Sequence, residues 1–521
     1  MKHLFFNYFI LFTLATWSAG VFGQGLKPGS GLYYNIRSYG AVGDGKKLEQ
    51  AAINKAIESC SKNGGGTVYI PPGRYLSGSI HLKSNINLYL EVGATIIAAP
   101  STMGAYDPPE PFPDTAYQDR GHTYFHNSLI WGEGLSNVSI TGRGMIDGTA
   151  LPREDTDEER KLLKGQTGVG NKTIALKQCK NILIRDITIY HGGHFAIIVT
   201  GCDRVTLENL DIDTNRDGID IDCCTNTLVN NCRVNSPGDD AIVAKSSYAL
   251  NRPVITENLI ITNCQVSAFK VGTLLDGTRV PDEVPWSGGA WSSGRIKFGT
   301  ESNGGFRNCV VSNCTFWYSN GIALEMVDGG IMDNIIVSNI SMTNVHHYPI
   351  YVTLGQRNRV PKSTTKMGTI RNIMISNINV IGADSLSGIQ ITGMPGYPIE
   401  NITLRNISIQ YKGGGTLAQA ARKFPELGKG YPEPSLLGVN PSYGLFARHV
   451  KGLGLYDLSF STLVTDARPA IIAEDVQRLD IDRFRFPENK TGLNYLFSDV
   501  TDFTIQNSPS LKRAAEAQKI K

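Results

Sequence analysis

Ile182-Leu-Ile-Arg-Asp186, Val205-Thr-Leu-Glu-Asn209 and Thr227-Leu-Val-Asn-Asn231 are three copies of one pattern, an alternating strand that ends in Asn or Asp. The terminal residue returns after 23 and then 22 residues. The pattern recurs, with longer insertions, at residues 259–263, 310–313, 335–339, 373–377 and 402–406. Because too little helical sequence separates the copies to build crossovers, they predict a parallel β-helix, in which equivalent residues stack about 4.8 Å apart.

The residue after the terminal Asn or Asp is apolar in each of these copies, which predicts a column of core side chains. The column consists of Ile187, Leu210, Cys232, Cys264, Cys314, Ile340, Ile378 and Ile407. We interpret its three cysteines as packed core thiols, with disulfides or metal ligands as alternatives. The nine cysteines of the chain are an odd number, and none has the Cys-x-x-Cys spacing of metal sites. Asn suits the ladder because it tolerates unusual backbone angles and can hydrogen-bond to its copies.

Outside the repeats, the pattern predicts one all-β solenoid with a short helix near its start. Leu48–Ser61 carries apolar residues at helical spacing. Four stretches break the strand rhythm and predict long loops on the flank of the solenoid: Pro100–His126, Met145–Asn171, Ser267–Ser293 and Ala418–Pro441. We predict a single β-helix catalytic domain over residues 24–508 and a solvated C-terminal tail over residues 509–521.

The first residues predict export. Met1-Lys2-His3 precedes an apolar stretch from Leu4 to Trp17, which is the order of a secretory signal peptide and is too short for a membrane anchor. We expect a signal peptide over residues 1–23 and a secreted or periplasmic protein. The net charge of +3 in 521 residues, without a Lys/Arg run, argues against a nucleic-acid partner. We also expect no membrane partner and a monomer.

Two neighbouring repeats carry carboxylates at matching places, in Asn215-Arg-Asp217-Gly-Ile-Asp220 and in Gly238-Asp239-Asp240. Asp217 and Asp240 are 23 residues apart, which is one coil. Like charges at about 4.8 Å raise at least one pKa, as a general acid at neutral pH requires. Glycoside hydrolysis needs one carboxylic acid and one carboxylate, so Asp217, Asp239 and Asp240 are the candidate catalytic residues. A Ca²⁺ site or a solvated acidic edge is the alternative.

These motifs resemble the polygalacturonases of glycoside hydrolase family twenty-eight. Asn215-Arg-Asp217-Gly is similar to the family's Asn-Thr-Asp-Gly, with Arg in place of Thr, and Gly238-Asp239-Asp240 is similar to its Gly-Asp-Asp. Tyr39–Gly45 and Gly64–Gly73 also resemble its N-terminal coils. The resemblance implies a right-handed β-helix and an inverting mechanism without a cofactor or metal. In that mechanism Asp239 is the general acid, and Asp217 and Asp240 orient the water.

The chain departs from the family on the next two coils. The family's Gly-His-Gly is expected where this chain has Ser293–Gly299, and its Arg-Ile-Lys where this chain has Gly321–Glu325. A literal Arg295-Ile-Lys297 does occur. Counting from Asp239 equates it with the family's carboxylate-binding motif, whereas the strand pattern places it one coil earlier. We favour the strand pattern, and in either alignment Arg295 and Lys297 predict contact with a uronate-containing glycan.

The predicted substrate is therefore a plant-type or other acidic, pectic polysaccharide. Candidate substrate-binding residues are His194, Asp220, Lys245, Arg295, Lys297, Glu301, Glu325 and Arg357. Aromatic residues that could stack on sugars or simply pack are Trp286, Trp291, Trp317 and Tyr318. Two other functions stay open: a β-helix polysaccharide lyase, with Arg295 or Lys297 as base and Ca²⁺ on the acidic trio, and a non-catalytic glycan-binding protein.

Overall fold

The computed structural model describes residues 33–113, 120–152, 171–282, 293–359, 366–385 and 388–511. The predicted signal peptide over residues 1–23, the tail residues 512–521, and Trp286 and Trp291 lie outside the described residues.

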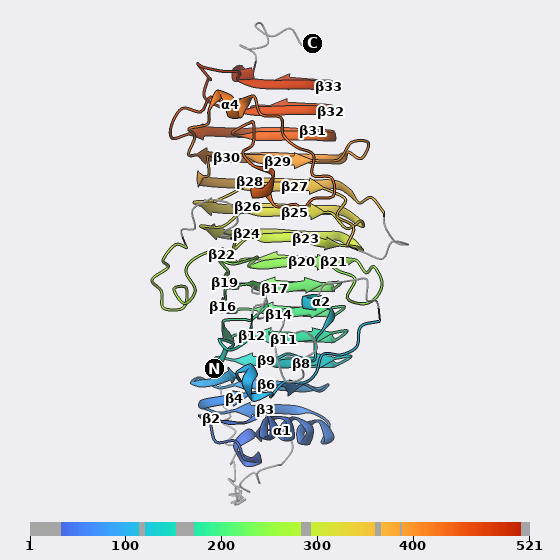
Figure 1. Ribbon diagram of the computed structural model, residues 1–521, viewed down its shortest axis with the longest axis vertical. Helices are drawn as coiled ribbons and strands as arrows, with labels where there is room; N and C mark the ends of the chain where they lie inside the picture. Colours follow the sequence, from blue (N-terminus) through green and yellow to red (C-terminus); the bar gives the residue numbers. More distant parts are fainter. Residues whose placement is uncertain are drawn as a thin grey trace, which may run out of the picture.

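The described chain winds into a tall stack of coils, a right-handed parallel β-helix as predicted (Figure 1). Successive strands join three sheets in turn, and the pairings between coils are parallel. The first sheet contains β1 (Tyr33–Asn35), β3 (Gly66–Ile70), β6 (Ile86–Leu90), β9 (Ser136–Gly142), β12 (Lys180–Arg185), β15 (Asp203–Glu208), β18 (Thr225–Asn230) and β21 (Thr256–Thr262). The second sheet contains β2 (Asp44–Leu48), β4 (Gly73–Ser77), β7 (Ala94–Ala98), β10 (Met145–Asp147), β13 (Thr188–Tyr190), β16 (Asp211–Asp213), β19 (Arg233–Asn235) and β22 (Gln265–Ser267).

The third sheet carries the candidate site. It contains β5 (Ile80–His81), β8 (Ile130–Glu133), β11 (Lys172–Lys177), β14 (Phe195–Thr200), β17 (Asp217–Asp222), β20 (Ile242–Ser246), β23 (Ile296–Ser302), β25 (Ile322–Met326), β27 (Ile350–Leu354) and β29 (Ile389–Thr392). In later coils one long strand passes through the first and second sheets, as in β24 (Gly305–Trp317), β26 (Ile331–Thr343), β28 (Thr369–Ala383) and β30 (Ile399–Tyr411). The last coils contain β31 (Leu445–Thr462), β32 (Ile471–Asp482) and β33 (Tyr495–Gln506), and the starts of β31 and β32 extend the third sheet.

The few helices lie outside the stack. The predicted N-terminal helix is α1 (Gln50–Lys62), which covers the first coils with its buried face of Ala52, Ile53, Ala56, Ile57 and Cys60. The remaining helical segments are short: η1 (Ile36–Tyr39), η2 (Ser101–Met103), α2 (Arg120–Thr123), α4 (Leu417–Ala420) and α5 (Pro434–Leu437). No helix among the described residues is both long enough and apolar enough to cross a membrane.

The predicted Asn ladder is present at the bend between the first and second sheets. Asn209 Nδ2 donates to Asp186 Oδ1 at 2.7 Å, and Asn231 Nδ2 donates to Asn209 Oδ1 at 3.1 Å. The backbone φ is 54° at both asparagines, a left-handed conformation that Asn tolerates better than most residues. The ladder continues in later coils, where Asn377 donates to Asn339 and Asn339 to Asn313, each at 3.0 Å.

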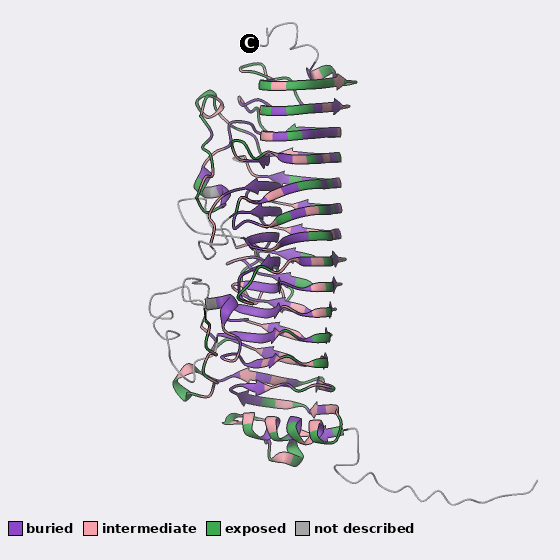
Figure 2. Ribbon diagram, turned by 90° about the vertical axis from the view of Figure 1, so that its right-hand side faces the viewer, coloured by how far each residue is buried: buried purple, intermediate pink, exposed green. Residues whose placement is uncertain are grey.

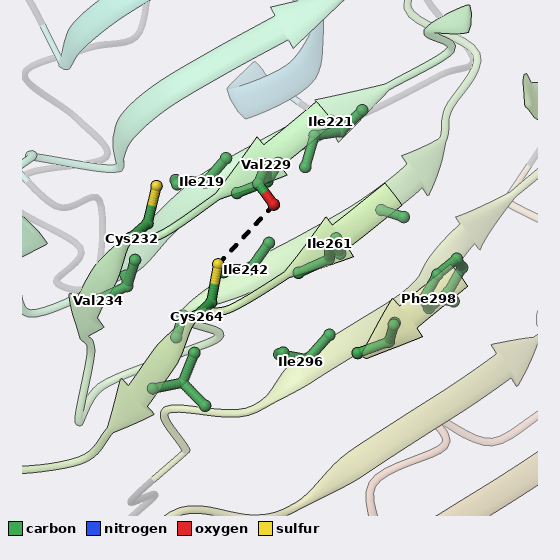
Figure 3. Packing of buried hydrophobic residues seen from close by; sticks show 14 of the residues in the cluster. Ile219, Ile221, Val229, Cys232, Val234, Ile242, Ile261, Cys264, Ile296 and Phe298 are labelled. Carbon is green, nitrogen blue, oxygen red and sulfur yellow. Dashed lines mark hydrogen bonds between the residues drawn. The ribbon is translucent and has the colours of Figure 1, made fainter. Parts of the chain in front are cut away.

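The cysteines are core thiols, as predicted. All nine are free and buried. Figure 3 shows Cys232 and Cys264 among Ile219, Ile242 and Val234, with the Cys264 thiol 3.9 Å from the carbonyl oxygen of Val229. The disulfide alternative is therefore wrong for these residues.

One apolar core runs from Tyr34 to Leu511 through the inside of the coils. Its last member, Leu511, is buried, and Ser510 Oγ donates to the carbonyl oxygen of Phe486 at 3.0 Å. The chain thus packs on the last coil beyond residue 508. The segments that contain α2 and α5 lie on the same side of the stack (Figure 2). The segment after β22 instead packs at the end of β16, where the backbone N–H groups of Gly272 and Leu274 donate to Asp213 Oδ2.

Candidate active site

Asp217 and Asp240 lie on adjacent coils of the third sheet, as their spacing predicts. Ile219 of β17 pairs with Ile242 of β20, which sets Asp217 opposite Asp240. The backbone N–H of Asp240 donates to Asp217 Oδ1 at 3.2 Å and to Asp239 Oδ1 at 3.0 Å. One oxygen of each of the three aspartates lies within 4.8 Å of the others. The three carboxylates therefore form one cluster.

Gly218 permits this close approach of the two coils. Its N–H donates to the carbonyl oxygen of Asp240 at 3.0 Å, and a Cβ at this position would lie 2.5 Å from the carbonyl oxygen of Ala241. A side chain there would push the coils apart, so the Asp-Gly pair is a local requirement of the cluster.

Arg295 and Lys297 lie on the coil after Asp240. Ile296 pairs with Ile242 on one side and with Ile322 on the other, so Gly321–Glu325 follows one coil later. This is the placement that the strand pattern predicts. Arg295 Nε donates to Asp240 Oδ1 at 2.6 Å, Lys297 Nζ pairs with Asp240 Oδ2, and Ser293 Oγ donates to Asp240 Oδ1 at 3.2 Å.

Lys245, at the end of β20, joins three predicted site residues. Its Nζ lies 3.1 Å from Asp217 Oδ2, 2.9 Å from Asp220 Oδ2 and 3.9 Å from Glu301 Oε2. Asp220 faces outward but is buried. The oxygen that contacts Lys245, Oδ2, also lies 3.4 Å from His122 Nε2. Asp220 thus adjoins the catalytic cluster through Lys245.

A second ionic group lies at the carboxyl ends of β23, β25 and β27. Arg357 donates to Glu301 Oε1 at 3.0 Å, to Thr300 Oγ1 at 3.1 Å and to Asp328 Oδ1 at 3.0 Å. Arg359 also donates to Glu301 Oε1, at 3.2 Å. Because Glu301 contacts Lys245 as well, this group is continuous with the catalytic cluster.

Two glutamates flank Arg295 on the side away from Asp240. Arg295 NH1 lies 3.9 Å from Glu325 Oε1, and its NH2 lies 3.3 Å from Glu433 Oε2. Glu433 comes from the flank segment that ends at α5. The guanidinium of Arg295 thus contacts three carboxyl groups of the protein itself.

His194 borders the cluster. The following residue, Phe195, pairs with Asp217, and the His194 ring packs edge-on against the Phe195 ring with centroids 4.4 Å apart. The Phe195 ring in turn lies 5.1 Å from Lys245 Nζ. The structure therefore brings all eight predicted substrate-binding residues to the catalytic cluster or its border.

The predicted aromatic contacts lie elsewhere. Trp317 ends β24 in the second sheet, with the Arg279 guanidinium 5.9 Å from its ring. Tyr318 packs against Phe269 and His346. Both residues make packing contacts, which is the role that the sequence favours for aromatic residues at strand ends.

Comparisons with known proteins agree with the β-helix fold. The family model "Rhamnogalacturonase A/epimerase, pectate lyase-like" matches residues 33–269. A probable polygalacturonase of Vitis vinifera is 24% identical over 413 residues, covering 75% of this chain and 76% of that protein. Two solved structures share the fold. An exopolygalacturonase of Thermotoga maritima has a TM-score of 0.56 at 22% identity, covering 73% of this chain and 87% of that one. A family 28 exopolygalacturonase of Yersinia enterocolitica has a TM-score of 0.57 at 16% identity, covering 92% and 78%.

The chain therefore resembles polygalacturonases over 75% of its length. Its Asp-Gly and Gly-Asp-Asp motifs lie on adjacent coils.

Asp217 and Asp240 differ in their tendency to hold a proton. Burial, together with the charge of Asp239, raises the pKa of Asp217 well above its usual range, although Lys245 opposes the shift. Burial also acts to raise the pKa of Asp240, but Arg295 and Lys297 outweigh it and hold that pKa well below its usual range. One buried carboxyl is therefore suited to keep a proton while its neighbour on the next coil stays ionised.

The cations keep their charge. Burial acts to lower the pKa of Lys297, but the carboxylate of Asp240 outweighs it and raises that pKa above its usual value. Lys297 is therefore an ammonium ion at neutral pH and cannot act as a base there.

The acidic trio is the group of described residues whose oxygens could surround a metal ion. Both oxygens of Asp240 already contact cations, Oδ1 through Arg295 and Oδ2 through Lys297. This charge balance suits the trio to acid–base chemistry better than to Ca²⁺, which prefers uncompensated carboxylates.

Sequence reasoning missed several contacts of the site: His122, Phe195, Ser293, Asp328 and Glu433. His122 and Glu433 belong to the segments that interrupt the repeats. The interruptions mark these segments as flank loops, but nothing in their sequence indicates which side chain turns towards the third sheet.

Proposed function

We propose that the protein hydrolyses glycosidic bonds of a pectic, uronate-containing polysaccharide or oligosaccharide, with inversion at the anomeric carbon, outside the cell. The observation that carries the proposal is the contrast between Asp217 and Asp240. The two carboxyl groups lie on adjacent coils, and the pKa of one is raised while that of the other is lowered. Glycoside hydrolysis requires such a pair of protonated and ionised carboxyl groups.

Asp239 acts as the general acid in this proposal. Its side chain is 33% exposed, whereas those of Asp217 and Asp240 are 5% and 0% exposed, so Asp239 is the member of the trio that a departing sugar oxygen can reach. The proton that Asp239 donates comes from buried Asp217, whose pKa is raised and whose carboxyl oxygen lies within 4.8 Å of an oxygen of Asp239. Asp240, held ionised, accepts a proton from the attacking water.

The assignment of inversion rests on how the two buried aspartates are held. Carboxyl oxygens within 4.8 Å of one another approach the separation of about 5–5.5 Å that is usual in retaining enzymes. However, Asp217 and Asp240 each have both oxygens engaged by donors or cations. Carboxylates fixed in this way are better suited to orient a water molecule than to attack carbon, and the family resemblance also implies inversion.

Arg295 and Lys297 support a uronate as the sugar at the reacting position. They are the cations of the coil next to Asp240, and a planar guanidinium matches a carboxylate geometrically. Asp240, which stays ionised and already pairs with both cations, weakens this attraction. The proposal therefore requires one uronate and leaves room for a neutral neighbour in the chain.

A lyase is the second candidate, and the state of Lys297 argues against it. A lyase needs a neutral base to remove a proton from carbon, whereas Asp240 keeps Lys297 charged. A non-catalytic glycan-binding role leaves the opposite pKa shifts of Asp217 and Asp240 without a purpose.

The test is a substrate screen with homogalacturonan, rhamnogalacturonan and their oligosaccharides, with and without a chelator. We expect new reducing ends, no ultraviolet-absorbing unsaturated product and no effect of the chelator. Proton NMR of the first product gives the anomer and hence the stereochemistry. An unsaturated product that disappears with the chelator would establish the lyase, and inactivity on all of these substrates would refute the pectic assignment.

A further inference from the structure

One registered row of outward side chains runs along the third sheet through the catalytic coils. Backbone pairing places its members directly above one another. Every member is at most 3% exposed, and in chain order the row is Ala175, Ile198, Asp220, Val243, Lys297, Ala323, Tyr351, Gln390, Phe446 and Ile472. A bare sheet face does not hide its outward residues to this degree.

The first sheet provides the comparison within the same molecule. Its outward row contains Ile260, Ile336 and Met374, which are 44%, 37% and 45% exposed. The two sheets have the same strand spacing, so the difference in exposure comes from what covers the third sheet.

The flank segment before β31 covers the C-terminal part of the row. Phe424 and Leu437 pack on Phe446 and Ile472 in a separate apolar cluster. The same segment delivers Glu433 to Arg295 at 3.3 Å. This cover therefore extends from the last coils to the coil next to Asp240.

A second flank segment covers the N-terminal part of the row. Phe125 packs on Ala175, Phe195 and Ile198. From the same segment, His122 reaches Asp220 at 3.4 Å. The two segments thus contact the catalytic coils from opposite ends of the molecule, and both lie on the same side of the stack (Figure 2).

Part of the described site reaches solvent. Asp239 is 33% exposed, Tyr431 is 42% exposed, and the Arg359 side chain is 39% exposed. Tyr431 is close enough to Lys297, Glu301 and Asp239 for their charges to affect its hydroxyl, and the Arg357 guanidinium lies 5.6 Å from its ring. Tyr431 therefore lies beside the proposed general acid, and Arg359 joins the same ionic group through Glu301.

We infer that the protein takes the end of a glycan chain into this opening and releases a short product, and that it does not cut within a chain. This inference rests on the proposed hydrolase function. A polymer that crossed the cluster along the coil axis would have to lie on the hidden row, where the two flank segments already pack. A chain end needs only the opening at Asp239.

The test compares bond cleavage with loss of viscosity, using the full-length protein and the pectic polymer that it cleaves in the substrate screen. We expect a mono- or disaccharide as the product from the first turnovers, with little loss of viscosity per new reducing end. In a second measurement, kcat/KM per molecule is determined for oligosaccharides of increasing length. It should stop rising at a short length, because only the terminal sugars enter the site.

An early collapse of viscosity with products of many lengths would overturn the inference and leave hydrolysis intact. A kcat/KM that keeps growing with the number of internal bonds would do the same. Failure to cleave any pectic substrate would instead remove the proposed function. The end of a polymer and a free oligosaccharide present the same terminal sugar. The length series distinguishes these two substrates, because it shows whether the protein cleaves long chains as well as short ones.

Discussion

The ammonium group of Lys245 lies 3.1 Å from Asp217 Oδ2, although the two residues belong to strands one coil apart. Both side chains are nearly buried, with 7% and 5% of their surface exposed. Lys245 is the cation that opposes the rise in the pKa of Asp217, since burial and Asp239 act in the other direction. The proton held by the catalytic trio therefore depends on Lys245.

Replacement of Lys245 by Met should raise the pKa of Asp217 further. Because Asp217 holds the proton of the trio in the proposed mechanism, the alkaline limb of the pH–rate profile moves to higher pH, and kcat falls by about tenfold because a weaker acid donates its proton less readily. The matched control is Lys180→Met on β12, an exposed lysine 3.8 Å from Asp203, which should leave the profile unchanged. A Lys245→Met profile that superimposes on that of the wild type would contradict this role.

Two aspartates of the trio should separate catalysis from stability. Asp239→Asn should reduce kcat by roughly 10²–10⁴-fold with little change in melting temperature, because Asp239 is partly exposed. Asp240→Asn should also abolish activity, and it should lower the melting temperature clearly because Arg295 and Lys297 lose their buried partner. Asp211→Asn, at an exposed ion pair with Arg233, is the control for both measurements. Full activity of Asp239→Asn would exclude it as the acid.

The sequence predicts the catalytic cluster because a β-helix converts sequence spacing into position. Without an insertion, one coil is 22 or 23 residues, so Asp217 must meet Asp240. Arg295 is harder to place because an insertion precedes it. The strand pattern still resolves its coil, since β23 must stay in register with β20.

The flank contacts could not be predicted in this way. Glu433 is 138 residues from Arg295 in sequence, and His122 is 98 residues from Asp220. Their segments have no repeat, so their path is set by side-chain packing such as that of Phe424 on Phe446 rather than by a register. For the same reason, the sequence does not predict that the flank segments cover the third sheet. The chain-end inference depends on this cover.

The Asn ladder should contribute measurable stability. Asn339 donates to Asn313 and accepts from Asn377, each at 3.0 Å, with a backbone φ of 58°. Asn339→Ala loses these bonds and adds the strain of a left-handed alanine, for a cost of about 2 kcal/mol. Asn339→Gly loses the bonds without the strain and should cost about 1 kcal/mol. Equal melting temperatures for the two variants would contradict the strain component.

The buried thiols predict the response to reductant and thiol reagents. Since all nine cysteines are free and buried, dithiothreitol should not change the melting temperature. Burial also raises the pKa of thiols such as Cys60, to about 11, which further suppresses the reactive thiolate. A thiol reagent should therefore react slowly with the native protein and rapidly after unfolding in denaturant. A drop in melting temperature on reduction would reveal a disulfide.

Glu325 should make the stability of the protein depend on pH. Burial raises its pKa from 4.5 to about 7, although Arg295 and Lys297 oppose the shift. Between pH 4.5 and 7 the folded state therefore holds a proton that the unfolded state has lost, so the stabilising contribution of Glu325 is full below pH 4.5 and is lost as the pH rises to 7. Glu325→Gln should flatten this decline, seen as a smaller fall in melting temperature across the window.

The pKa of His347 shifts in the opposite direction from that of Glu325, so His347 serves as the comparison for this experiment. Burial and the charge of Arg295 lower its pKa from 6.5 to about 3, so the unfolded state binds the extra proton and stability is lost as the pH falls from 6.5 to 3. His347→Gln should therefore flatten the acid side of the stability curve, while Glu325→Gln flattens the side that approaches neutrality. If Glu325→Gln instead steepens the decline between pH 4.5 and 7, the carboxyl of Glu325 is ionised in the folded protein and its assigned environment beside Arg295 is wrong.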